Sequence, residues 1–205
     1  MPPKRKARKA AAAIDLTEEA SPEKKPARVK AEALVKSVGF EGKIAKEVAE
    51  ALTQTLEDEA TLKETRAKAE GGDGYAMYCL GVWYEKGEYG LAVDKAQARS
   101  WYERSAAARD PKGIAAFGNC LLLGIGGPED HVFGIMNVTE AAGLGSDLSA
   151  YRLGWAFFEG GHGLSKDPVR ARYWLKKIAD GECEHKHLQQ KNITEAAEWL
   201  RELDQ

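Results

Sequence analysis

The amino-acid sequence predicts an all-α fold in which helix-loop-helix repeats stack into a solenoid. First, residues 154–180 match residues 81–107 without a gap when the chain is shifted by 73 positions. The paired positions share small, aromatic or acidic side chains: Gly81 with Gly154, Tyr84 with Phe157, Gly87 with Gly160, Asp94 with Asp167, Ala98 with Ala171, and Trp101 with Trp174. Second, a weaker copy lies halfway between them, where Gly118 and Gly124 follow Gly81 and Gly87 by 37 residues. Three units of about 36 residues are typical of a helical solenoid.

The first helix of each unit, helix A, is predicted from spacing. Ala76, Leu80 and Tyr84 recur every four residues and so share one helical face. Gly81 costs stability inside a helix, which favours a site where another helix approaches closely. Helix A is expected to end at the glycine-bearing loop 87–90, whose backbone angles glycine adopts without strain.

The second helix, helix B, is predicted from its capping residues. Asp94 and Asp167 are expected N-caps, and Gln97 stands at the capping-box position. The expected inner face of helix B combines one large aromatic residue with small ones: Ala98, Trp101, Ser105 and Ala106. In the second copy Gly134 and Asn137 replace the alanine and the tryptophan, which leaves its helix B open.

These motifs resemble the Sel-one-like repeat, a relative of the tetratricopeptide repeat. The first copy carries the pattern at Leu80-Gly81, Tyr84, Gly87, Asp94, Ala98 and Trp101, and the third copy at Leu153-Gly154, Phe157, Gly160, Asp167, Ala171 and Trp174. The similarity covers about residues 72–181. It implies a right-handed superhelix of antiparallel helix pairs, a fold used in adaptor and scaffold proteins. The ordinary tetratricopeptide unit is the nearest alternative, but its turn between helices is shorter.

The remaining chain is predicted to flank the repeats. Residues 1–40 are expected to be a disordered basic tail, and 41–70 one or two helices that cap the first repeat. The region 71–182 holds the three repeats at about 72–109, 110–144 and 145–181. Residues 183–205 are expected to form a linker and a closing helix, with a capping box of Asn192 and Glu195. We expect a monomer, because 41–70 lacks three clean heptads for a coiled coil.

The N-terminal tail carries an excess of positive charge. Residues 1–30 have a balance of +5 and the rest of the chain −7, within a net charge of −2. The tail holds a basic cluster of Lys4, Arg5, Lys6, Arg8 and Lys9. This cluster is typical of a nuclear localisation signal read by an import receptor, and equally of an electrostatic tether to nucleic acid or another polyanion. Ser21, before a proline, and Lys30, in a sequence like that of SUMO acceptors, are candidate modification sites.

An aromatic stripe predicts the partner-binding surface. Tyr151, Trp155 and Phe158 recur at helical spacing on a face roughly opposite Leu153 and Phe157. Their equivalents in the first copy include Tyr78 and Val82. Aromatic residues along a groove suit the capture of a peptide or helix. The alternative is that neighbouring repeats bury these side chains, since solenoid helices pack on two sides.

No motif predicts catalysis, a metal or a cofactor. Cys183, His185 and His187 form the best metal candidate, but structural zinc needs four ligands and no second pair stands nearby. The glycine-rich stretch 124–128 lacks the strand before it and the Lys-Ser/Thr ending of a phosphate loop. Some cysteine-rich bacterial members of the resembling family have been linked to β-lactam chemistry, yet the paired cysteines of those members are absent. We therefore expect a non-enzymatic, nuclear or cytosolic interaction scaffold without a membrane span.

Overall fold

The computed structural model describes residues 24–184 and 188–205, which contain helices and connecting loops but no strand. The predicted all-α solenoid is confirmed over these residues. They form two compact units, one ending at Glu57 and the other beginning at Asp58. Helix α2 (Gly42–Glu70) runs from the first unit into the second.

The first unit corrects the predicted extent of the disordered tail. Helix α1 spans Lys24–Val38, a segment that was expected to lie within a disordered region ending at residue 40. Ala31 and Val35 lie one turn apart on this helix, and both are buried. The tail was defined by its shortage of large apolar side chains, whereas this helix buries a small residue beside a valine. Residues 1–23 lie outside the described part of the chain.

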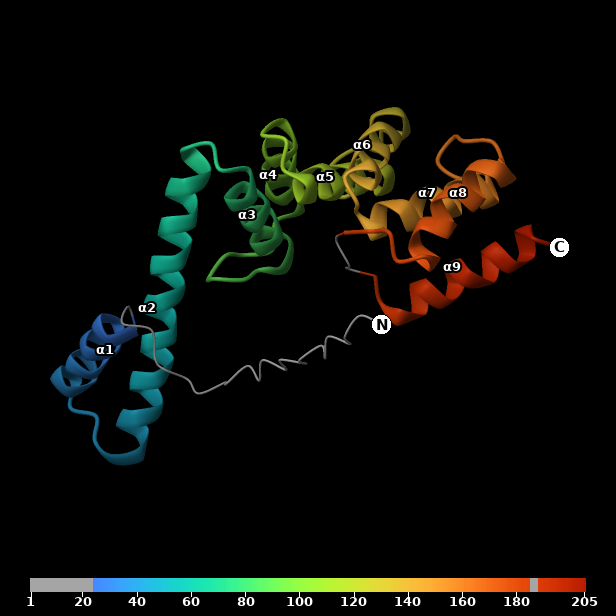
Figure 1. The fold of residues 1–205 in the computed structure, drawn as a ribbon. Helices are drawn as coiled ribbons and strands as arrows, with labels where there is room; N and C mark the ends of the chain where they lie inside the picture. The colour runs from blue at the N-terminus through green and yellow to red at the C-terminus, as the bar shows by residue number, and fades with distance from the viewer. Residues whose placement is uncertain (1–23, 185–187) are drawn as a thin grey trace, which may run out of the picture. The chain divides into compact units, whose positions relative to one another are not determined.

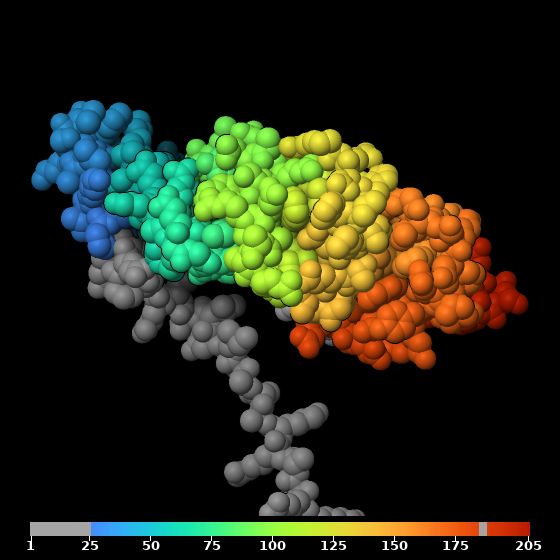
Figure 2. All heavy atoms as spheres, turned by 90° about the horizontal axis from the view of Figure 1, so that it is seen from above, coloured from blue at the N-terminus to red at the C-terminus, as the bar shows by residue number. Residues whose placement is uncertain are grey.

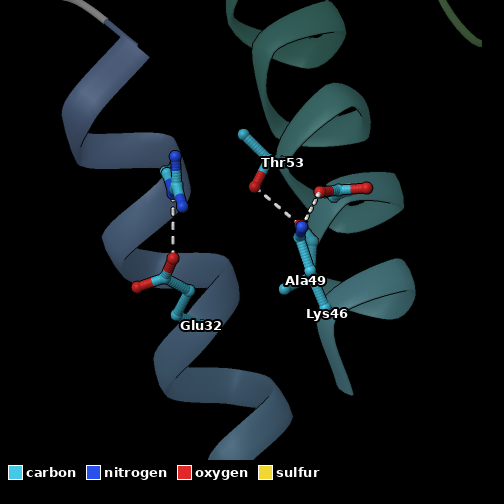
Figure 3. Close-up of polar contacts among 6 residues, drawn as sticks. Glu32, Lys46, Ala49 and Thr53 are labelled. Carbon is cyan, nitrogen blue, oxygen red and sulfur yellow. Dashed lines mark hydrogen bonds and ion pairs between the residues drawn. The ribbon is translucent and has the colours of Figure 1, made fainter. Parts of the chain in front are cut away.

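The polar contacts drawn in Figure 3 each lie within one helix of the first unit. On α1 the Arg28 guanidinium lies 2.9 Å from the Glu32 carboxylate, and on α2 Thr53 donates a hydrogen bond to the Ala49 carbonyl. Ile44, near the start of α2, is 60% exposed. Val48, one turn later, is half-buried, and Ala49 beside it is buried.

The second unit contains the three predicted helix pairs. The pairs are α3 (Gly74–Lys86) with α4 (Lys95–Ala107), α5 (Pro111–Leu123) with α6 (His131–Gly143), and α7 (Asp147–Glu159) with α8 (Pro168–Ala179), and α9 (Gln190–Leu203) follows them. Each helix from α3 to α9 packs against the next one in sequence. In addition α3 contacts α5, and α7 contacts α9, so the A helices share one side of the stack. Figures 1 and 2 show the repeats following one another in chain order, from green through yellow to orange.

An aspartate N-cap closes the loop of every repeat, including the second. Asp94 and Asp167 each accept two backbone hydrogen bonds at the start of helix B, and Asp130 accepts one from Phe133. The backbone N–H of Asp94 donates to the Tyr84 carbonyl at 2.8 Å, so it is already satisfied without Gln97. Helix B of the second copy, which the sequence left open, therefore forms as α6.

Close packing of A and B helices depends on a glycine in each pair. A Cβ atom at Gly81 would lie 2.4 Å from the Tyr102 ring, and one at Gly154 would lie 2.6 Å from Leu175. The sequence predicted that Trp101 and Trp174 would pack between the two helices, but both are only half-buried. The residue that packs against the glycine is instead the one after each tryptophan, Tyr102 or Leu175.

The other positions shared by the repeats are mostly buried or end a helix. Leu80, Ala98, Leu153 and Ala171 have no exposed surface, and Phe157 is 8% exposed. Tyr84 is half-buried, and its hydroxyl accepts a hydrogen bond from Arg66. Gly87 and Gly160 end their A helices with φ angles of 74° and 79°, in the left-handed region that favours glycine.

Both ends of the repeat array are covered by helices. Leu62 and Ala69, in the later part of α2, pack with Leu80 of α3. At the other end, α9 begins at Gln190, so the predicted capping box of Asn192 and Glu195 is wrong. The Glu195 carboxylate instead accepts a hydrogen bond from the Tyr151 hydroxyl at 2.7 Å.

Candidate peptide-binding groove

The A helices of the three repeats enclose a groove of about 300 Å³. Its walls come from α3, α5 and α7, with Tyr102 of α4 at its base. The lining combines aromatic, small and charged side chains, including Tyr78, Val82, Glu85, Lys112, Ala115, Asn119 and Arg152. A concave surface with an apolar floor and a few polar groups is the usual form of a ligand site.

The groove exists because the second repeat lacks an aromatic side chain. Tyr78 and Tyr151 occupy equivalent positions 73 residues apart, and the equivalent position between them is Ala115. The next position of the second repeat is also small: it is Ala116, whose equivalents are Cys79 in the first repeat and Arg152 in the third. A row of side chains along the A helices is thus interrupted at α5, which leaves the hollow.

Two polar groups at the groove are satisfied within the chain. The Tyr102 hydroxyl donates a 2.6 Å hydrogen bond to the Glu85 carboxylate. Burial, followed by this contact with Glu85, raises the pKa of Tyr102, so the phenol stays protonated. The Lys112 ammonium lies 4.8 Å from the centre of the Tyr75 ring, within cation–π range.

Two other polar groups at the groove have no hydrogen-bond partner in the described part of the chain. They are the Nε atom of Arg152 and the Oδ1 atom of Asn119, and both atoms are shielded from solvent. Burial lowers the pKa of Arg152, since the guanidinium has lost part of its hydration. Two side chains that line the groove therefore each have one buried atom that the chain leaves without a partner.

The predicted aromatic stripe divides between the groove and the chain's own C-terminal helix. Tyr78 and Val82 line the groove. Tyr151 and Phe158 are covered instead, because the Trp199 ring of α9 stacks on both, with ring centres 5.3 and 5.8 Å apart. Burial, the alternative drawn from the sequence, thus applies to Tyr151 and Phe158, whereas partner binding by Tyr78 and Val82 stays a prediction.

Trp155, the last member of the stripe, packs against the loop of its own repeat. A Cβ atom at Gly161 would lie 2.5 Å from the indole, and the His162 ring is 5.4 Å from it edge to face. Trp155 still lines a second hollow of about 280 Å³ beside Tyr151 and Arg152. It is therefore half-buried beside the groove.

The tail residues singled out from the sequence are mostly beyond the described structure. Lys4, Arg5, Lys6, Arg8, Lys9 and Ser21 all lie outside the described residues. Lys30 is described and lies exposed on helix α1, which corrects its expected place in a disordered tail. Its neighbours are engaged in the helix, since Ala31 is buried and Glu32 is paired with Arg28.

The candidates for other chemistry find structural roles. Cys183 is 6% exposed and packs with Leu153 and Val138 in the core, whereas His185 and His187 lie outside the described residues. Among residues 24–184 and 188–205 no group of three metal-binding side chains comes together. Nor is any helix in these ranges long and apolar enough to cross a membrane.

Sequence reasoning missed Arg152 and Asn119 as groove residues. Both carried a detectable signal, because aligning the three copies shows a polar residue at each position where the other copies have none. The closing helix was predicted and forms as α9, but the stacking of its Trp199 on Tyr151 and Phe158 was not.

Comparison with known protein families identifies the first and third repeats. The Sel1 repeat model matches residues 74–110, 147–183 and 187–202. The first two ranges contain α3–α4 and α7–α8, and the third contains α9, so α9 corresponds to half of a further repeat. The second pair, α5–α6, lies outside the matched ranges although it is built in the same way.

Solved structures give a similar result, whereas no curated protein matches the chain. The crystal structure of a Sel1 repeat protein from Oxalobacter formigenes is 26% identical, with a TM-score of 0.56, and the match covers 69% of this chain and 98% of that one. The structure of c5321, a protective antigen present in uropathogenic Escherichia coli strains and displaying an SLR fold, is 22% identical, with a TM-score of 0.32. That match covers 86% of this chain and 45% of c5321.

Proposed function

We propose that this chain is a non-enzymatic scaffold that holds a segment of a partner protein in the α3–α5–α7 groove. The proposal is supported by its Sel1 repeats, because proteins with this fold mediate protein–protein interactions and are generally not catalytic. The observation that carries this proposal is the groove itself. Three consecutive repeats contribute to it, and half-buried Tyr78 of the first repeat lines it, whereas the equivalent Tyr151 stacks on Trp199 of α9.

The groove can be closed by restoring the aromatic side chain that the second repeat lacks. Ala115→Tyr places at this position the residue that stands at the equivalent positions of the other two repeats. The tyrosine fills the hollow, so the variant should retain less partner. Ala107→Tyr is the matched control, because Ala107 is exposed at the end of α4 and outside the groove.

Partner capture from a cell extract by the full chain and both variants tests the proposal, with bound proteins quantified by mass spectrometry. We expect a set of proteins retained by the wild type and by Ala107→Tyr but lost with Ala115→Tyr. Circular dichroism of each variant confirms that the fold is intact. If Ala115→Tyr retains every partner at wild-type levels, the groove is not the binding surface.

We also propose that the basic cluster Lys4, Arg5, Lys6, Arg8 and Lys9 directs the scaffold to the nucleus through an import receptor. What supports this is the sequence alone, a dense run of positive charge at the end of a chain that is otherwise acidic. The test is the distribution of a fluorescent fusion in which the five residues are replaced by glutamine. Nuclear signal should fall without them. An unchanged distribution together with salt-dependent binding to nucleic acid would favour the polyanion tether.

A further inference from the structure

Arg152 is a half-buried cation on the α7 wall of the groove. In the described part of the chain no carboxylate pairs with it, and its Nε atom has no hydrogen-bond partner. Burying an unpaired charge costs free energy, since the ion loses water and gains no compensating interaction. Neither of the equivalent positions, Cys79 and Ala116, carries a charge, so the repeat fold does not require one here.

Asn119 repeats this situation on the neighbouring wall. Its Oδ1 atom is buried without a partner on α5, at a position where the other repeats have Val82 and Trp155. Two polar side chains that the repeat does not need thus lie on adjacent helices of one groove. Buried polar groups are normally hydrogen-bonded, so such a pair indicates a bound ligand.

The charge of the lining selects the kind of ligand. Among the described lining residues Lys86, Lys112 and Arg152 are positive, and Glu85 is the single carboxylate. The Glu85 carboxylate already accepts the hydrogen bond from Tyr102. The groove therefore has a positive balance, although the body of the chain is acidic, and it is complementary to a negatively charged segment.

Helix α9 shows how such a segment binds to an A helix of this chain. Its Glu195 carboxylate accepts the hydrogen bond from Tyr151, and Trp199, one turn later, stacks on Tyr151 and Phe158. A carboxylate and an aromatic ring one turn apart thus occupy the side of α7 next to the groove. The equivalent aromatic residue in the first repeat, Tyr78, is half-buried against Tyr75 and Tyr102, and it lines the groove.

We propose that the groove binds an acidic segment of a partner protein, with one of its carboxylates paired to Arg152 and an apolar side chain seated in the hollow at Ala115. This inference rests on the proposed scaffold function and specifies the chemistry of its ligand. The guanidinium of arginine matches a carboxylate in a bidentate geometry, which adds specificity as well as affinity.

The test measures the affinity of the full chain for two short fluorescent peptides by anisotropy. One peptide contains glutamates around a single phenylalanine, and the other replaces every glutamate with glutamine. Arg152→Met removes the charge and keeps an unbranched apolar side chain. Arg201→Met is the matched control, because Arg201 is exposed on α9 outside the groove. The basic tail is present in every protein compared, so its contribution cancels.

We expect the wild type and Arg201→Met to prefer the glutamate peptide by about tenfold or more, the change that 1.4 kcal/mol produces. Arg152→Met should lose most of this preference, and the remainder comes from Lys86, Lys112 and the basic tail, which every variant keeps. Its urea midpoint should be equal to or above that of the wild type, since the variant removes an unpaired buried charge. This second measurement separates lost recognition from lost folding, because a structural role for Arg152 would lower the midpoint.

Three results would overturn the inference. The first is equal affinity of the wild type for both peptides, and the second is a glutamate preference in Arg152→Met as large as that of the wild type. The third is a single-stranded oligonucleotide that binds the wild type but not Arg152→Met, which would make the groove a nucleic-acid site. The scaffold proposal would stand in the first two cases if Ala115→Tyr still abolished partner capture.

Discussion

The glycine in the middle of each A helix offers a sharp test of how the repeats pack. We predict that Gly81→Ala destabilises the protein although alanine is the better helix former. The helix itself should gain about 0.5–1 kcal/mol. However, the new Cβ would lie 2.4 and 2.5 Å from two ring carbons of Tyr102, which is 3% exposed and hydrogen-bonded to Glu85.

The magnitude follows from these opposing terms. Overpacking a filled core costs about 1–3 kcal/mol, and a contact this short between a methyl group and a fixed ring belongs at the upper end. The net loss should therefore be about 1–2 kcal/mol, after the helix gain is subtracted. In a domain of this size such a loss lowers Tm by about 2–8 °C.

Urea unfolding followed by tryptophan fluorescence measures this loss. All five tryptophans lie beyond Asp58, so their signal reports on the repeat unit. Gly143→Ala is the matched control, since a Cβ there meets nothing within 4 Å, and it should leave stability equal or slightly raised. Tyr102→Leu in the Gly81→Ala background should recover part of the loss, because leucine takes this place opposite Gly154. If Gly81→Ala is as stable as Gly143→Ala, the helices do not mesh at this glycine.

Three further predictions concern buried side chains. Leu175→Ala should lower the free energy of unfolding by about 2–5 kcal/mol, and by more than Trp174→Ala, because Leu175 is fully buried and Trp174 is not. The reverse order in urea unfolding would contradict the assignment of Leu175 as the residue that packs against Gly154. Burial, then His131 and Arg152, lowers the pKa of His162, so its contribution to stability is present above pH 6.5 and is lost as the pH falls. His162→Gln should weaken this acid dependence of Tm, and identical pH profiles for variant and wild type would refute it. Burial raises the pKa of Cys120 to about 11, so the thiol should resist a thiol reagent at pH 8 until urea unfolds the chain. Its contribution to stability should be lost as the pH rises from 9 through 11. Rapid labelling of Cys120 in the native protein would refute its burial.

The repeat architecture could be predicted from the sequence because its signals are local. Asp94 and Asp167 cap the helices that follow them, and Gly87 and Gly160 end the helices before them, so each residue acts within a few positions of itself. The second repeat was harder to recognise because its helix B lacks the tryptophan. It forms nevertheless, since Asp130 supplies the same cap.

The wrong predictions concern features that depend on contacts between segments far apart in the sequence. The register between helices A and B places Tyr102, and not Trp101, against Gly81. The sequence alone does not show which of two neighbouring helix residues faces the other helix. Glu195 fits a capping box by spacing, but its carboxylate bonds to Tyr151, 44 positions away. The α1 helix was missed because Ala31 contributes to packing by being small.

The same comparison of repeats explains why the hollow lies at the least regular copy. In a solenoid of identical repeats each A helix would present the same aromatic residue, and the row of rings would leave no hollow. Here Tyr151 of the third repeat is covered by Trp199, a residue of the chain itself. In the second repeat Ala115 replaces the ring, and Asn119 beside it and Arg152 on α7 each have one buried polar atom that the fold leaves unsatisfied. Loss of the repeat pattern in the second repeat therefore has a physical counterpart, because positions released from packing between repeats line the groove in which we propose that a partner binds.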